Sequence, residues 1–225
     1  FISRHQTKDG SFSFAAKGGN NNEPHNHNDI GHFILQGNNE VFLKDLGSGL
    51  YTKDYFSEKR YTFLCNGSQG HSVPIINHQF QEEGSFRQAA ILQTDVGREE
   101  DVFELDLAKA YELEILQRLT RKFTWVKKDL PKLIVEDRYS FSDQPVSIME
   151  RLIIPALKIT EKENEVILEG NQRLSIQYDS RLLYLEVKKL NFINHFGNME
   201  ENYALDFTVL NPVKACKVQL IFQFE

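Results

Sequence analysis

Cysteine, tryptophan and long hydrophobic runs are scarce in this chain of 225 residues, and each shortage excludes a class of protein. There are two cysteines, Cys65 and Cys216, and one tryptophan. The cysteines are far apart and form no C-x-x-C pair, so neither a redox motif nor a thiolate zinc site is supported. They form one disulfide or remain two buried thiols, and we favour the two thiols.

No apolar run approaches the roughly 20 residues that a helix needs to cross a bilayer, and no signal-like segment opens the chain. We therefore expect no membrane partner. The chain begins abruptly on Phe1-Ile2-Ser3-Arg4, as a fragment of a longer protein would. The compartment is consequently left open, with a slight preference for a secreted or periplasmic one.

An excess of basic residues is also missing, because the formal net charge is −6. This charge argues against a polyanion-binding surface spread over the whole molecule, and we expect no nucleic-acid partner. If the ligand is acidic, the basic residues that bind it must be local.

What the chain does have is aromatic residues in an alternating pattern. Seventeen Phe and eight Tyr, within 40% hydrophobic content, favour pleated sheet and are enough to fill a core. Apolar and polar residues alternate in Ser11–Phe14, Gln117–Val126 and Leu182–Val187, and turn signals follow at short intervals. The pattern predicts an all-β protein, a large antiparallel β-sandwich, in one domain over residues 1–225.

The expected strands follow this alternation, with a hairpin turn at Gly37-Asn38-Asn39. Residues 101–111 fit either a strand or a helical turn. We expect strands at Ile2–His5, Ser11–Ala16, Gly31–Gln36, Glu40–Leu46, Tyr61–Cys65, Arg87–Thr94, Glu114–Val126, Lys132–Phe141, Val146–Ile154, Glu165–Glu169, Arg173–Tyr178, Leu182–Lys189, Tyr203–Leu210 and Ala215–Phe224.

The stretch Pro24-His25-Asn26-His27-Asn28-Asp29 concentrates polar chemistry in six residues. His25 and His27 are two apart, so in an extended segment both imidazoles point to one face. Asp45 and His71 lie downstream, each within two residues of a glycine. His27, Asp45 and His71 meet the count of three protein ligands that a zinc-type site with an open position requires. The alternative is surface histidines in a polar loop, with Asp45 a turn residue.

A cupin barrel competes for the same residues, since Gly19 followed by His25-Asn26-His27 resembles the start of its first metal motif. That motif needs a glutamate four or five residues after the second histidine, where this chain has Gly31 and His32. The cupin therefore ranks well behind. A nuclease of the His-Asn-His type is discarded, because no basic face is evident.

Several blocks together resemble the heparinase II/III-like polysaccharide lyase family. They match in the correct order over roughly residues 14–84, and Arg118 to Tyr139 resembles a later part of the same domain. The blocks are Phe14–Gly19, Pro24–Gly31, Asp45–Thr52, Phe56–Tyr61 and Gly70–Pro74. The family joins an N-terminal helical toroid to a C-terminal antiparallel β-sandwich, and this chain is similar to the second part only.

The resemblance implies a role for each matching residue. His27, Asp45 and His71 match metal ligands, usually for zinc or another divalent ion, and His25 matches a catalytic histidine that faces an acidic polysaccharide during β-elimination. Asn26 and Arg60 are assigned to substrate binding, since an arginine fork fits a sugar carboxylate. The family's catalytic tyrosine and carboxylate-neutralising asparagine belong to the helical domain. We therefore expect a lyase that needs this missing domain as its partner, and little activity from the chain alone.

Some residues depart from the pattern or have a second interpretation. Ser72 follows His71 where the family commonly has asparagine, and His32 is interpreted mainly as a core or strand-face histidine. Other candidates for sugar contacts are Lys17, Lys53, Lys59, Tyr51 and Tyr55. We favour a solvated edge or an ion pair for Lys53 and Lys59, and packing for the two tyrosines. A non-catalytic carbohydrate-binding or scaffold domain stays open as the alternative function.

Overall fold

Long antiparallel strands with one buried face make up most of the molecule, which the computed structural model describes over all 225 residues. The largest sheet has eight strands in the order β13-β14-β15-β18-β11-β10-β9-β8. Their bounds are β8 Ala90–Val96, β9 Glu100–Asp106, β10 Leu116–Val126, β11 Lys132–Phe141, β13 Lys158–Lys162, β14 Glu165–Glu169, β15 Arg173–Gln177 and β18 Ala215–Phe224.

Two four-stranded sheets face it, and a two-stranded sheet joins β3 and β7. The first runs β1-β2-β4-β5 and the second β16-β17-β12-β6, and the two adjoin where the Lys44 N–H donates to the Ile153 carbonyl at 3.0 Å. The bounds are β1 Ile2–Thr7, β2 Gly10–Ala16, β3 Asn20–Asn21, β4 Phe33–Gly37, β5 Glu40–Leu43, β6 Pro74–Ile76, β7 Gly84–Gln88, β12 Ile148–Pro155, β16 Leu183–Ile193 and β17 Met199–Val209.

Aromatic rings on the inner faces join the layers. Phe14 of β2 lies 5.1 Å from Phe123 of β10, and Phe33 of β4 lies 5.7 Å from Phe222 of β18, between ring centroids. These rings belong to one cluster of 38 buried hydrophobic residues drawn from all three large sheets. The all-β antiparallel sandwich expected from the alternating pattern is confirmed.

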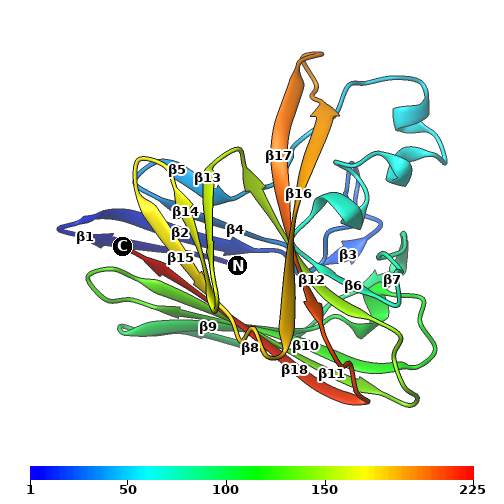
Figure 1. Cartoon of the computed structure of the whole chain (residues 1–225). Helices are drawn as coiled ribbons and strands as arrows, with labels where there is room; N and C mark the ends of the chain where they lie inside the picture. Colours follow the sequence, from blue (N-terminus) through cyan, green and yellow to red (C-terminus); the bar gives the residue numbers. More distant parts are fainter.

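The segment between β5 and β6 is different, because it contains no strand. It holds three short 3₁₀ helices, η1 Asp54–Phe56, η2 Arg60–Thr62 and η3 Ser68–Gly70, and lies at one end of the molecule beside β16 and β17 (Figure 1). A bridge between Gly49 and Asn194 ties it to the hairpin of those two strands. The site candidates lie on this segment and on the loop before β4.

Several strand predictions were wrong in detail. Tyr61–Cys65 is not a strand, because local bonds such as Thr62 N–H to the Lys59 carbonyl wind it into η2. Arg87–Thr94 spans parts of two strands, β7 and β8, that are separated at Ala89. The short β6 and the exposed, polar β13 were not expected.

The two open questions from the sequence have clear outcomes. Residues 101–111 are mostly strand, since β9 covers them to Asp106 and a 3₁₀ turn, η4 Ala108–Ala110, follows. Both cysteines are free thiols, with Cys65 buried and Cys216 half-buried. The structure contains no helix that could span a membrane.

Candidate metal centre

Three loops bring His27, Asp45 and His71 together. His27 lies between β3 and β4, Asp45 follows β5, and His71 follows η3. One ligand atom from each residue lies within 4.8 Å of the corresponding atoms of the other two. The rings of His27 and His71 are 5.3 Å apart between centroids. Residues separated by up to 44 positions in the sequence thus form one group, although metal binding itself stays a prediction.

A turn orients Asp45 toward the imidazoles. Its Oδ1 accepts a hydrogen bond from the Gly47 N–H at 2.6 Å, while its Oδ2 lies 3.4 Å from His71 Nδ1. Burial alone would raise the pKa of Asp45, but the nearby His71 and His32 rings and the Gly47 N–H hold it well below its usual range. Asp45 is therefore an anion, which is the form that binds a cation.

His71 carries the clearest sign that the group could hold an ion. Its side chain is fully buried, and neither ring nitrogen has a hydrogen-bond partner. A neutral imidazole has one donor and one acceptor, and leaving both unpaired in the interior is costly. Coordination would pair the lone pair of one nitrogen. The donor set of two imidazoles and one carboxylate fits a divalent metal such as zinc.

His27 is partly exposed and completes the group from the opposite loop. Burial, followed by the neighbouring His71, lowers the pKa of His27 to about 4, against the opposing effect of Asp45. The ring is thus neutral near pH 7, and a neutral imidazole is the form that coordinates metals.

His32 also belongs to this site, which the sequence interpretation largely missed. The residue is 3% exposed, and its ring lies 5.1 Å from that of His71 between centroids. Burial, followed by His71, lowers the pKa of His32 to about 3. The available signal was its position inside the apolar run Ile30–Leu35, because a histidine buried there needs a polar partner.

His25 lies on the surface two residues before His27 and adopts an uncommon backbone conformation. Its φ of 60° falls in the left-handed region, which residues other than glycine rarely occupy. Such outliers persist where the surroundings enforce them, and they gather at functional sites. The assignment of His25 to catalysis stays a prediction.

Asn26 and Arg60 hold the loop that carries the histidines. Arg60 donates from Nη2 to the Asn26 carbonyl at 2.8 Å, and Asn26 Oδ1 accepts from the Tyr61 hydroxyl at 2.8 Å. The guanidinium also lies over the ring of Tyr55, 5.1 Å from its centroid. Asn26 is only 9% exposed. Both residues thus have structural partners, and their roles in substrate binding stay predictions.

Two arginines on strands of the sheets donate hydrogen bonds to backbone carbonyls of the same loops. Arg121 of β10 donates from Nη1 to the carbonyls of Gly31 at 3.1 Å and Ser72 at 2.9 Å. Asp137 and Glu150 hold its other nitrogens at 2.7–2.8 Å. Arg151 of β12 donates to the Gln69 carbonyl at 2.9 Å. The sheets therefore fix the backbone on both sides of His71.

Two of the lysines considered for sugar contacts are engaged in ion pairs. Lys17 lies 2.5 Å from Asp29, and the exposed Lys59 lies 3.5 Å from Asp54. These pairs match the alternative that we weighed for such residues. Arg60 therefore remains the strongest basic candidate beside the histidines.

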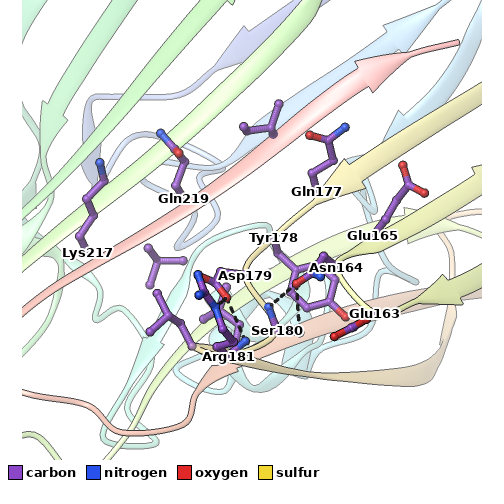
Figure 2. Close-up of a pocket in the computed structure, with 14 residues that line it drawn as sticks. Glu163, Asn164, Glu165, Gln177, Tyr178, Asp179, Ser180, Arg181, Lys217 and Gln219 are labelled. Atoms are coloured by element: carbon purple, nitrogen blue, oxygen red, sulfur yellow. Dashed lines mark hydrogen bonds and ion pairs between the residues drawn. The ribbon is translucent and has the colours of Figure 1, made fainter.

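One large cavity lies away from these residues, over β15, β18 and the loop that leads into β16 (Figure 2). Its volume is about 990 Å³, and it shares no lining residue with the metal group. All of its charged groups except Glu163 are paired: Arg181 with Asp179 at 2.7 Å, Glu165 with Lys162 at 2.9 Å and Lys217 with Glu136. This cavity therefore offers no cluster of free functional groups comparable to the metal centre.

Solved structures of polysaccharide lyases share this fold. Heparan sulfate lyase HepC from Pedobacter heparinus superposes with a TM-score of 0.80 at 15% identity, over 96% of this chain. A heparinase III gene product matches all of the chain with a TM-score of 0.77 at 12% identity, and another heparinase III covers 99% with 0.73 at 15%.

At such low identity the likeness establishes the fold. The chain spans 33–34% of the length of these solved structures. No family model and no curated protein matches the sequence. The small barrel that a cupin would require is replaced by the large sandwich, with the candidate metal group on loops at its edge.

Proposed function

We propose that this chain is the β-sandwich domain of a polysaccharide lyase that cleaves uronic-acid-containing polymers by β-elimination. In this proposal one divalent ion, preferentially zinc, is held by His27, Asp45 and His71, and His25 faces the substrate. The observation that carries it is the convergence of these ligands from three loops on a fold shared with heparan sulfate lyases.

The donor set explains the preference for zinc. Zinc takes imidazole nitrogen and carboxylate oxygen at about 2.0–2.2 Å, and a three-ligand site leaves one position open. A bound ion would supply a fixed positive charge that links the three loops. It would also pair the lone pair of one nitrogen of the buried His71.

In this proposal the chain contributes proton transfer at the sugar. In β-elimination the base His25 would take the C5 proton, the electrons of that bond would form the C4=C5 double bond, and the C4–O bond would break. The departing oxygen takes a proton from an acid. An imidazole is a side chain that commonly serves as the general base in such a step. Arg60 would contribute by neutralising the uronate carboxylate.

Elemental analysis tests the metal centre. We expect one ion per chain in the wild type and its loss in His27→Ala and His71→Ala, because each variant removes one of three ligands. His195→Ala, which removes an exposed histidine of the β16–β17 hairpin, is the matched control and should keep the ion. Unchanged metal content in both ligand variants would remove the metal from the proposal.

Activity must be measured in the full-length enzyme, because the resemblance places the catalytic tyrosine and asparagine in a helical domain. Mixing it with an acidic glycan should produce the absorbance of an unsaturated uronate, and His25→Ala should slow this by at least about 100-fold if the imidazole is the base. An undiminished rate would reject that role for His25.

A non-catalytic carbohydrate-binding or scaffold domain is the second candidate. The observation in its favour is that Asn26 and Arg60 are engaged in holding the loop. A wild-type protein that binds the acidic glycan and forms no unsaturated product would support this alternative.

A further inference from the structure

The protonation of the His32 ring can be assigned from its surroundings. The backbone N–H of Ser72 donates to His32 Nδ1 at 2.9 Å. A neutral imidazole that accepts at one nitrogen carries its hydrogen on the other. His32 therefore carries its hydrogen on Nε2.

This hydrogen faces the carboxylate of Asp45. His32 Nε2 lies 3.6 Å from Asp45 Oδ2, just beyond hydrogen-bond range, and has no hydrogen-bond partner. The second oxygen, Oδ1, is already bonded to the Gly47 N–H. Asp45 Oδ2 thus lies between the rings of His32 and His71. The orientation of the carboxylate therefore depends on which ring nitrogens carry a hydrogen.

The backbone that sets the His32 tautomer is itself held in place. The Ser72 carbonyl accepts from Arg121 Nη1 at 2.9 Å, and the Ser72 hydroxyl oxygen accepts from the Ile153 N–H at 2.9 Å. Ser72 is fully buried, so water does not compete for these bonds. The donor direction of His32 is therefore imposed by the β10 and β12 strands.

We propose that His32 is a positioning residue of the metal centre, which directs its Nε2 hydrogen at the Asp45 carboxylate and is not itself a ligand. The inference rests on the proposed metal site. A ring nitrogen that carries hydrogen has no lone pair for an ion, so His32 acts only through Asp45. Partners of this kind typically change metal affinity by about 10–100-fold when they are removed.

Two amide variants separate the two ends of the ring in the full-length protein. In His32→Gln the amide nitrogen can replace Nε2 as donor to Asp45. In His32→Asn the amide oxygen can replace Nδ1 as acceptor from Ser72, but no donor reaches Asp45. We expect His32→Gln to bind Zn²⁺ within about threefold of wild type and His32→Asn to bind about 10–100-fold more weakly.

Zn²⁺ affinity is measured by competition with a chromophoric chelator, and unfolding midpoints report any general loss of structure. The Co²⁺ absorption spectrum of His32→Gln should match wild type, because the ligands are unchanged. A changed spectrum would identify His32 as a ligand and overturn the inference. The positioning role of His32 would also be rejected if His32→Asn bound Zn²⁺ as tightly as wild type. A wild-type protein that binds no metal would reject the metal centre together with this inference.

Discussion

The first 83 residues and the remaining 142 residues differ in whether their buried polar groups have partners. In residues 84–225 the interior charges are paired, as Arg121 is with Asp137 and Glu150. Five of the eight buried side-chain atoms without a partner lie in the first region, three of them on His32 and His71. All five non-glycine residues with positive φ also lie there. The unmet groups of His32 and His71 and the left-handed backbone of His25 thus lie at the candidate site, whereas the other four positive-φ residues lie in turns after β4 and β6.

Side chains of the second region hold the backbone of the first region in place. Arg121 and Arg151 belong to long strands, yet their guanidinium groups bond carbonyls at Gly31, Gln69 and Ser72. A loop-rich segment has few backbone bonds of its own to set its shape. The comparison therefore predicts that the site geometry depends on contacts made by the sheets.

Arg121→Met should have the largest effect, because it removes a contact between the sheets and the site loops. The substitution leaves Asp137 and Glu150, whose side chains are 3% and 2% exposed, without their cation. We expect the free energy of unfolding to fall by about 3–5 kcal/mol, as when one partner of a buried ion pair is removed. Urea denaturation measures the loss.

Arg138→Met is the control, because that side chain is 66% exposed and pairs with Glu136 on the same strand. It should cost less than about 1 kcal/mol. Amide hydrogen exchange in Arg121→Met should rise first around residues 25–32 and 66–73. An equal rise in β16 and β17 would contradict the dependence of the site loops on Arg121.

A smaller effect is expected from two glycines with the same left-handed backbone in the two regions. An added Cβ at Gly31, with φ of 85°, would lie 2.6 Å from the buried Leu107 side chain, whereas at Gly197, with φ of 79°, nothing lies within 4 Å. Gly31→Ala should therefore cost about 2–4 kcal/mol from strain plus overpacking, and Gly197→Ala about 1–2 kcal/mol from strain alone. Equal losses in urea denaturation would mean that packing around Gly31 adjusts freely.

The sequence predicted the second region better than the first, for a physical reason. Alternation marks strands with one buried face, and β11 and β18 were expected within one residue of their bounds because they have such faces. Local hydrogen bonds decide the shape of η2, and alternation carries no information about them. The candidate ligands came from residue type and family resemblance, whereas the contacts of His32 and Arg121 join residues 40–90 positions apart.

The pH dependence of stability isolates the buried network of the second region. Burial, followed by the charge of Asp137, raises the pKa of Glu150 to about 8. Unfolded Glu150 ionises near the ordinary pKa of 4.5, so the stabilisation is complete below that pH and is lost as pH rises through 8. Between pH 6.5 and 8 the free energy of unfolding should fall by up to about 2 kcal/mol.

Glu150→Gln is the matched variant and should flatten this decline. Burial lowers the pKa values of His27 and His32. Their stabilisation is therefore present above the ordinary pKa of 6.5 and is lost as pH falls toward about 4 and 3. Most of their effect therefore lies below pH 6.5, and little of it remains above about pH 7.5. An unchanged slope in Glu150→Gln would place the titration on another group.

The smallest expected effect is the difference in stability between a glycine and an alanine variant, which should have opposite signs at the exposed residues His25 and His195. At His25, with φ of 60°, glycine accepts the left-handed backbone without the Cβ penalty of about 1–2 kcal/mol, which outweighs its entropic cost of about 0.5–1 kcal/mol. His25→Gly should therefore be more stable than His25→Ala. At His195 of the β16–β17 hairpin, whose φ is not positive, the order should invert, because only the entropic term remains. Urea denaturation of the four variants measures both differences. The same order at both sites would show that the backbone of His25 carries no strain, and its left-handed conformation would no longer distinguish the site-bearing region.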